Sequence, residues 1–360
     1  MVELCLHYNT GVWYNSNMNL KFPPKKGAEK ERKTEREKVE ERREEVLSRG
    51  RKFKYPLQYA KHKLVINTVI IAVVGVILLV VAGWAALYKF QDMGDIMYRI
   101  SLVVPVPVAS VDGKAVRFSD YLMTARSSLT ALDTQSAFDG REEDLGAVEN
   151  GYKRQALTQA EELTYALKLG EELGVTVSDE EVAVAFDEHR KVGGAERSEE
   201  SFLKVLNTNF GLSKDEYNRM LYLSLMKSKV AQAIDKDAEA LAKKAEQILR
   251  ENGGDFQAAK DALGEKVDFA TTGGLIDNKN VDGGRSGKAM SLKVGEMSGR
   301  FLSTNGDGYY FVKTMDKNDT QVSYVSLYIR FTEFAKRFEE VEKNELIKEY
   351  INIPELNNEE

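Results

Sequence analysis

Cysteine and histidine are almost absent from this chain of 360 residues, which has one cysteine and three histidines. The cysteine is Cys5, so the chain beyond the first residues can form no disulfide and does not depend on oxidative folding. His7, His62 and His189 lie far apart in the sequence and do not form the clustered ligand pattern of a zinc site. No P-loop and no GxSxG motif is present either. We expect no metal and no cofactor.

Acidic residues outnumber basic ones in the long C-terminal part. Residues 1–63 hold 16 of the 51 basic and 9 of the 57 acidic residues, and residues 64–88 hold no charge. Residues 89–360 therefore keep 35 basic and 48 acidic residues, a balance of −13. An acidic surface of this kind excludes nucleic acid as a partner and disfavours electrostatic docking on anionic lipid.

One long apolar run, residues 64–88, divides the chain. As a helix these 25 residues span roughly 37 Å, which exceeds the ~30 Å hydrocarbon core of a bilayer. A cleaved signal peptide is the alternative, but its apolar core would be shorter and would begin near the N-terminus. Positive charge stays cytoplasmic, and six basic residues precede the run: Arg49, Arg51, Lys52, Lys54, Lys61 and Lys63. We predict a single-pass helix in the cytoplasmic membrane, with residues 1–63 inside and residues 89 onward outside.

The cytoplasmic segment, residues 1–63, is irregular at first and highly charged later. Met18 is an alternative start of the chain. Residues 28–49 predict a solvated charged helix or tail with too few apolar positions for a coiled coil. This stretch is a candidate contact for a cytoplasmic partner.

Residues 89–108 are predicted to form a linker. Pro105 and Pro107 favour an extended, stiff connector. No further proline occurs until Pro354, so the intervening turns rely on Gly, Asn and Asp.

Residues 109–236 predict a hairpin followed by helices. Asp112 and Gly113 form a strong signal for a type I′ turn between two short β-prone runs. The helices have recognisable start and stop signals. We expect them at residues 120–132 after a Ser119 cap, 149–173 before Gly174, 179–191 after a capping box at Ser178, 199–207, and 214–234 after Ser213.

The same residues carry a resemblance to a family. VDGKAVRFSDY, LGVTVSDEEV and GLSKDEYNRM resemble, in this order, the N-terminal chaperone domain of SurA-, PrsA- and PpiD-type foldases. The resemblance implies a helical domain that binds unfolded or nascent exported polypeptides. Met and Tyr side chains adapt to varied partners, so the candidate contacts are Met220, Tyr222, Leu223 and Met226. Plain core packing of this stripe is the alternative.

Residues 237–331 resemble a PpiC-type parvulin domain through ALAKKAEQILRENGGDFQAA, GGLI, SLKVGEMSGRF and NGDGYYFVKTM. This implies a small α/β domain whose pocket holds a proline-containing peptide. Tyr310 stands where the family has a pocket histidine, and Arg285 and Val281 stand where it has Phe and Met. Replacing an apolar wall in this way weakens binding of a proline ring, so we expect little or no isomerase activity. The catalytic residues are unknown, with Asp268 and Tyr310 as weak candidates, and Met290 and Tyr310 are candidate peptide contacts.

The family's first parvulin strand is missing before the helix that begins near Ala240. TQVSYVSLYIRF, residues 320–331, alternates strongly, and we predict that it pairs with the strand through Phe311. Residues 332–360 predict a C-terminal helix, about 333–350, that packs back on the helical domain, and a tail.

The predicted fold class is α+β: a single transmembrane helix, a mainly helical chaperone domain, a small α/β parvulin-like domain and a C-terminal helix. The predicted function is that of a membrane-anchored extracytoplasmic folding factor. An active prolyl isomerase is one alternative. A structural tether between a cytoplasmic partner and the cell envelope is the other.

Overall fold

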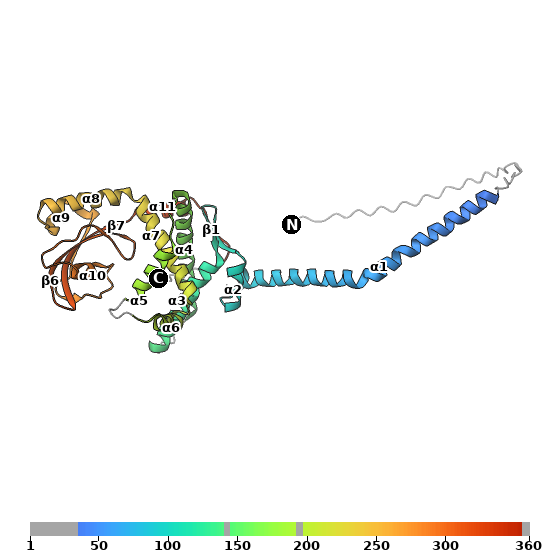
Figure 1. The fold of residues 1–360 in the computed structure, drawn as a ribbon, viewed down its shortest axis with the longest axis horizontal. Coiled ribbons are helices and arrows are strands. Elements are labelled where there is room, and N and C mark those ends of the chain that lie inside the picture. Colours follow the sequence, from blue (N-terminus) through green and yellow to red (C-terminus); the bar gives the residue numbers. More distant parts are fainter. Residues whose placement is uncertain (1–34, 140–144, 192–196, 355–360) are drawn as a thin grey trace, which may run out of the picture. The chain divides into compact units, whose positions relative to one another are not determined.

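The computed structural model describes residues 35–139, 145–191 and 197–354, without the side chains of residues 51–61, 136–139 and 145–147. The chain divides into two compact units, Met1–Ile77 and Leu78–Glu360. The expectations for residues 1–34, including the Met18 start, lie outside the described residues. The second unit is built from helices at its start and a small sheet towards its end, as expected for an α+β fold (Figure 1).

One helix, α1 (Glu35–Trp84), covers the charged stretch and most of the apolar run. It continues as a π-helical turn, η1 (Ala85–Lys89). Residues His62–Lys89 are long and apolar enough to cross a membrane, and the most apolar window of this stretch is not buried by protein. Residues 35–49 of the predicted charged segment are helical and exposed, as expected for a solvated helix.

The structure corrects the prediction that residues 89–108 form an extended linker. Residues 95–103 form a helix, α2 (Asp95–Val103), with Tyr98 and Ser101 buried against the rest of the unit. The two prolines follow this helix and therefore do not oppose it. Leu87 is buried in the core, and the Tyr88 hydroxyl donates to the Pro107 carbonyl at 2.6 Å. Leu87 and Tyr88, at the end of the apolar run, are thus part of the folded second unit.

The helical part of the second unit is formed by α2 to α7 and a hairpin. Asp112 and Gly113 both have positive φ, as a type I′ turn requires, and the capping boxes at Ser178 and Ser213 are both formed. Ser119 is not a cap, because it lies inside its helix with a buried hydroxyl. The elements are β1 (Pro107–Val111), β2 (Lys114–Arg117), α3 (Phe118–Asp139), α4 (Leu145–Leu173), α5 (Asp179–Arg190), α6 (Glu199–Phe210) and α7 (Lys214–Ile234).

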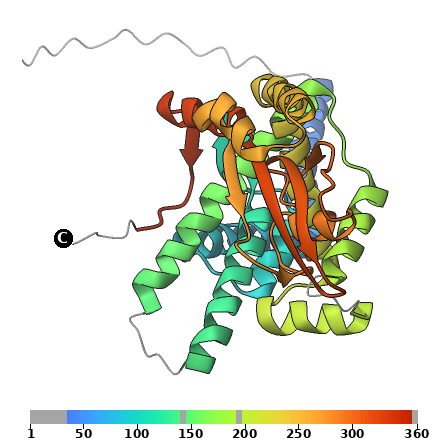
Figure 2. The same cartoon turned by 90° about the vertical axis from the view of Figure 1, so that its left-hand side faces the viewer.

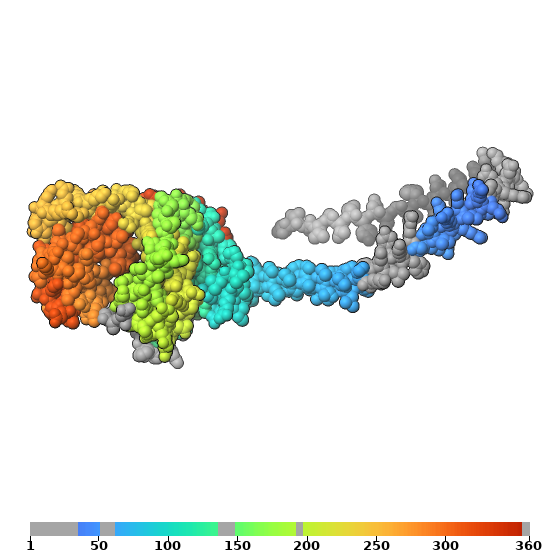
Figure 3. Space-filling view, viewed as in Figure 1, coloured from blue at the N-terminus to red at the C-terminus, as the bar shows by residue number. Residues whose placement is uncertain are grey.

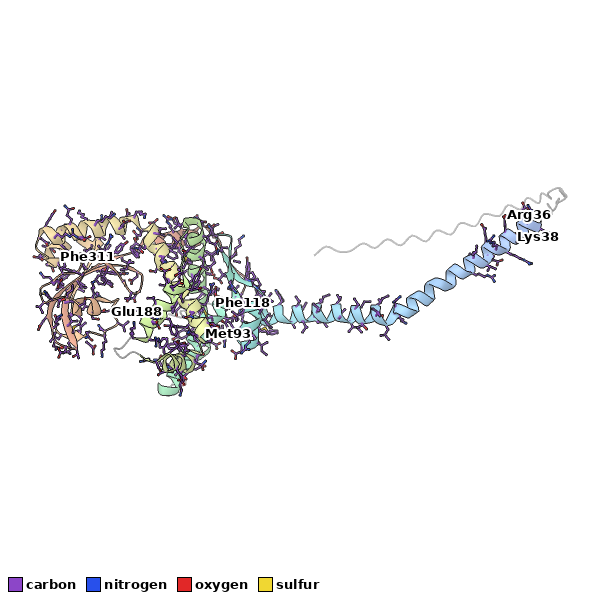
Figure 4. The ribbon with its side chains drawn as sticks, viewed as in Figure 1. Arg36, Lys38, Met93, Phe118, Glu188 and Phe311 are labelled. Carbon is purple, nitrogen blue, oxygen red and sulfur yellow. The ribbon has the colours of Figure 1, made fainter. Side chains whose placement is uncertain are left out.

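The α/β part follows, and its sheet has the order β3-β7-β6-β5, with β4 also paired to β7. The predicted pairing is confirmed, since Phe311 of β6 lies opposite Leu327 of β7. Phe311 and Leu327 face the core, and Figure 4 labels Phe311 on the side of α8. The elements are α8 (Lys236–Glu251), α9 (Phe256–Leu263), η2 (Gly264–Lys266), β3 (Asp268–Thr271), β4 (Ile276–Asp277), α10 (Arg285–Met290), β5 (Phe301–Leu302), β6 (Gly308–Lys317) and β7 (Gln321–Arg330).

The predicted C-terminal helix is too long. Helix α11 (Glu333–Lys343) ends seven residues before Tyr350, and β8 (Ile347–Glu349) pairs with β1 instead. Figure 2 shows β8 as a dark-red arrow apart from the main sheet. The packing prediction is confirmed, because Phe334 and Phe338 of α11 lie 5.7 and 5.8 Å from the Tyr165 ring of α4. A single cluster of buried apolar residues connects the helical part, the α/β part and the C-terminal segment.

Candidate functional site

A cleft of about 800 Å³ lies between the helical part and the α/β part. Helix α7, which begins after a capping box at Ser213, forms one wall. The space-filling view in Figure 3 shows the green helical part directly against the orange α/β part. The residues that line the cleft on α7 follow a helical spacing: Tyr217, Met220, Leu221, Leu223, Ser224, Lys227, Ser228 and Ala231.

The opposite wall is contributed by α11 and α4. Phe334 and Phe338 of α11 are buried, yet both border the cleft, and they rest on Tyr165. Leu163 of α4 and Met123 of α3 complete an apolar surface. Aromatic and aliphatic side chains at the base of a groove are what binds apolar side chains of a ligand.

Charged groups occupy the rim, and most are acidic. Glu162, Asp307, Glu339 and Glu342 line the cleft, and Lys227 is the counter-charge among them. The Lys227 ammonium forms an ion pair with Glu162 and lies 5.3 Å from the centre of the Phe334 ring. The ammonium of Lys343 lowers the pKa of the Glu339 carboxyl below its ordinary range. The rim therefore favours ligands that carry positive charge.

The loop before β6 forms the third side of the cleft. Gly306 has φ +71°, and a Cβ on it would lie 2.1 Å from the Ser228 hydroxyl of α7. Only glycine allows this close approach between the loop and the helix. The Asp307 carbonyl accepts hydrogen bonds from the Phe331 amide at 2.8 Å and the Tyr328 hydroxyl at 3.0 Å. The loop is thereby held at the mouth of the cleft.

The four residues predicted on α7 divide into two pairs. Met220 and Leu223 line the cleft, although Leu223 is only 1% exposed and belongs to the buried core. Tyr222 and Met226 are not among the lining residues. Met226 is buried, and its sulfur would lie 2.7 Å from a Cβ on Gly170, which places it in the core between α7 and α4. Met226 is therefore a core residue of this unit.

Tyr310 and Asp268 are not brought together. Tyr310 is buried and stacks on Tyr328 with ring centroids 4.5 Å apart, and the Arg285 guanidinium lies 4.9 Å from the centre of its ring. Asp268 lies opposite Tyr328 on the other neighbouring strand, is exposed, and approaches Arg330 at 3.6 Å. Burial raises the pKa of the Tyr310 hydroxyl, so this group stays protonated at neutral pH. Met290 packs beside a small apolar cluster under α10, as a core residue does.

A buried polar cluster next to Tyr310 is not indicated by the sequence. The Tyr324 hydroxyl donates to the Asp282 carboxylate, and the Ser286 amide donates to both carboxylate oxygens at 3.1 Å. Burial and the neighbouring Asp282 raise the pKa of Tyr324. A Cβ on Gly283 would lie 2.9 Å from the Tyr310 ring, so the backbone is pressed against that ring. The only local signal is the Asp-Gly-Gly turn of residues 282–284, because the tyrosine comes from a distant strand.

Among the residues that the structure describes, no group of three or more His, Cys, Asp or Glu side chains could hold a metal ion. His189, at the edge of the cleft, is exposed and contacts the Tyr217 hydroxyl at 2.5 Å through Nδ1. Partial desolvation of the imidazole lowers the pKa of His189.

Comparison with known proteins identifies part of the chain. Residues 57–231 match the model of a family described as the SurA-like N-terminal domain. The match includes the apolar helix and runs to α7, a little under half of the chain. No curated protein and no solved structure matches this chain.

Proposed function

We propose, from the SurA-like N-terminal domain at residues 57–231, that this chain is a membrane-anchored extracytoplasmic folding factor that binds unfolded polypeptides. Its apolar helix spans the cytoplasmic membrane once, with the N-terminus in the cytoplasm. The cleft between α7, α11 and the Gly306 loop is the observation that carries the proposal.

The cleft has the size and chemistry that a polypeptide segment requires. Its volume of about 800 Å³ accommodates several side chains, and its apolar base is lined by aromatic and methionine side chains. The acidic rim adds a preference for segments with basic residues beside apolar ones. A client would therefore contact Met220, Leu163 and the edges of Phe334 and Phe338, with Lys227 and Glu162 at the border.

Met220→Glu should weaken client binding. Met220 is partly exposed at the base of the cleft, and a carboxylate there removes apolar contact and would have to be desolvated when an apolar side chain of the ligand binds. Loss of part of the roughly 1.5–3 kcal/mol that a buried methionine contributes corresponds to about tenfold weaker binding. The measurement is suppression of aggregation of a chemically unfolded client by the full chain in nanodiscs, titrated against chain concentration.

Val184→Glu is the matched control, because Val184 is an exposed valine on α5 that does not line the cleft. It should leave the titration unchanged. Deletion of residues 28–49 should also leave it unchanged, whereas a tether would lose its role. If wild type and a correctly folded Met220→Glu protein suppress aggregation equally, the cleft does not bind the client.

We further propose that residues 237–331 form a parvulin-like module without catalytic power, which adds a second peptide surface. The position of the expected pocket histidine is taken by Tyr310, whose ring is covered by Arg285 and stacked on Tyr328. The Tyr310 ring is therefore in contact with the chain's own side chains, in a place where a proline ring would need free apolar surface.

Isomerisation of Xaa-Pro bonds should proceed at its uncatalysed rate in the presence of the full chain. The barrier of ~18–20 kcal/mol is lowered only by a pocket that holds the proline ring, and Tyr310 and Arg285 fill that place. The measurement is NMR exchange between the cis and trans forms of a proline peptide. Catalysis that Tyr310→Ala abolishes would show a rebuilt catalytic pocket and would replace this proposal with the isomerase alternative.

A further inference from the structure

Helix α2 exposes an apolar face that none of the described residues of the second unit covers. Ile96, Ile100 and Val103 recur at spacings of four and three residues, which places them on one side of the helix. Ile96 and Val103 are 72% and 83% exposed. The opposite side, with Tyr98 and Ser101, is buried against the domain. The helix is therefore amphipathic in its contacts: one side packs on the domain, and the other side presents apolar side chains to the exterior.

The position of α2 in the chain determines which surroundings are available. The Phe90 amide donates to the Ala85 carbonyl and the Asp92 amide to the Ala86 carbonyl, both at 2.9 Å, so the chain turns at once where the apolar helix ends. Only five residues separate Lys89 from Asp95, which limits their separation to about 20 Å.

Two exposed aromatic side chains lie near the end of the apolar run, a few residues before α2. Trp84, at the end of the apolar run, is 58% exposed, and Phe90 is also exposed. Tryptophan in this position is typical of the boundary between hydrocarbon and head groups. Leu87 and Tyr88, in contrast, are engaged by the domain, through burial and through the Pro107 carbonyl. Figure 4 labels Met93 and Phe118 at this junction.

We propose that α2 lies in the outer interface of the membrane that the apolar helix crosses, with Ile96, Ile100 and Val103 in contact with lipid. The proposal rests on the membrane anchoring of the proposed function. A short helix with one apolar face binds the head-group boundary parallel to the membrane plane. Together with the buried Leu87 contact it fixes the domain against the membrane.

Lipid is favoured over a second copy of the chain as the occupant of this face. The anchor holds α2 beside the bilayer permanently, so the contact with lipid is intramolecular and has a high effective concentration. Apolar area, not charge, provides the attraction. The acidic balance of residues 89–360 is therefore no obstacle, and the contact should form in neutral phosphatidylcholine.

Spin labels at single cysteines test the proposal in the full chain. Cys5→Ser removes the native thiol, and Ile96→Cys and Val103→Cys then carry a nitroxide in vesicles of phosphatidylcholine. Leu79→Cys, in the apolar helix, is the lipid control, and Val184→Cys, at a valine on α5 that is 62% exposed, is the water control. Power saturation compares collisions of each label with oxygen, which is concentrated in lipid, and with a water-soluble nickel complex.

Labels at residues 96 and 103 should collide several-fold more with oxygen than with the nickel complex, as at residue 79 and in contrast to residue 184. A water-like result at 96 and 103, with a lipid-like result at 79, would overturn this inference and leave the anchor intact. A water-like result at 79 would overturn the anchor itself. Spin–spin broadening at residue 103 without lipid exposure would assign the face to a second copy and likewise overturn the proposal.

Discussion

Asp235→Ala should lower the free energy of unfolding by about 3–5 kcal/mol. The Asp235 carboxylate is 2% exposed and accepts three backbone hydrogen bonds. One oxygen accepts from the Ala238 amide at 2.8 Å, which caps α8, and the other accepts from the Thr332 and Glu333 amides at 2.6 and 3.1 Å, at the start of α11. Loss of a helix cap costs about 1 kcal/mol, and each buried amide left without a partner costs about 1–3 kcal/mol.

The measurement is urea unfolding of the full chain in detergent micelles, followed by the near-ultraviolet circular dichroism of the folded unit. Asp255→Ala is the matched control, because Asp255 caps α9 through a single contact, to the Ala258 amide at 2.9 Å, and is exposed. It should cost only about 1 kcal/mol. If Asp235→Ala costs no more than Asp255→Ala, the junction of α7, α8 and α11 does not depend on this carboxylate.

Asp235 also links stability to the proposed cleft. The residue ends α7, begins α8 and holds the first turn of α11, whose Phe334 and Phe338 border the cleft. The Asn side chain in Asp235→Asn has one oxygen acceptor instead of two. That oxygen can accept either from the Ala238 amide or from the Thr332 and Glu333 amides, and the NH₂ group then faces the donors that remain. We expect it to fall between wild type and Asp235→Ala in stability, with client binding weakened in the same order.

Local signals explain what the sequence predicted correctly. The capping boxes at Ser178 and Ser213 involve residues three apart, so the two helix starts could be predicted without any knowledge of the fold. The pairing of residues 321–330 with the strand through Phe311 follows from strict alternation and a short connection. Each of these predictions concerns neighbours in the chain.

Non-local contacts explain what the sequence did not predict. Strand β8 forms because β1 offers an edge more than 230 residues earlier in the chain, and no pattern in residues 347–349 indicates that partner. The Asp282–Tyr324 contact joins two residues from different elements. The stripe on α7 identified the helix but not its orientation, so Met220 faces the cleft while Met226 faces α4.

Glu161 makes the stability of the second unit depend on pH. It is 3% exposed on α4, and one of its carboxyl oxygens has no hydrogen-bond partner among the described residues. Burial, together with Glu349 of β8 and Glu342 of α11, raises its pKa from 4.5 to about 8, and the opposing effect of Arg154 on α4 is smaller than that of burial. At neutral pH the folded protein therefore holds Glu161 mainly in its protonated form.

The direction of the pH dependence follows from proton binding. Between pH 4.5 and 8 the folded state keeps a proton on Glu161 that the unfolded state has released, so unfolding becomes easier as the pH rises. The contribution of Glu161 to the free energy of unfolding is largest below pH 4.5. It decreases by about 1.4 kcal/mol per pH unit until about pH 8. Glu161→Gln, which cannot ionise, should be about 3–4 kcal/mol more stable than wild type at pH 8, and equal to it near pH 5.

Urea unfolding of both proteins from pH 5 to pH 9 measures this difference. Glu162→Gln is the matched control, because Glu162 is the next residue on α4 and its carboxylate is partly exposed and paired with Lys227. The Glu162→Gln protein should keep the slope of the wild-type curve. A wild-type curve that keeps its slope in Glu161→Gln would assign the pH dependence to other groups.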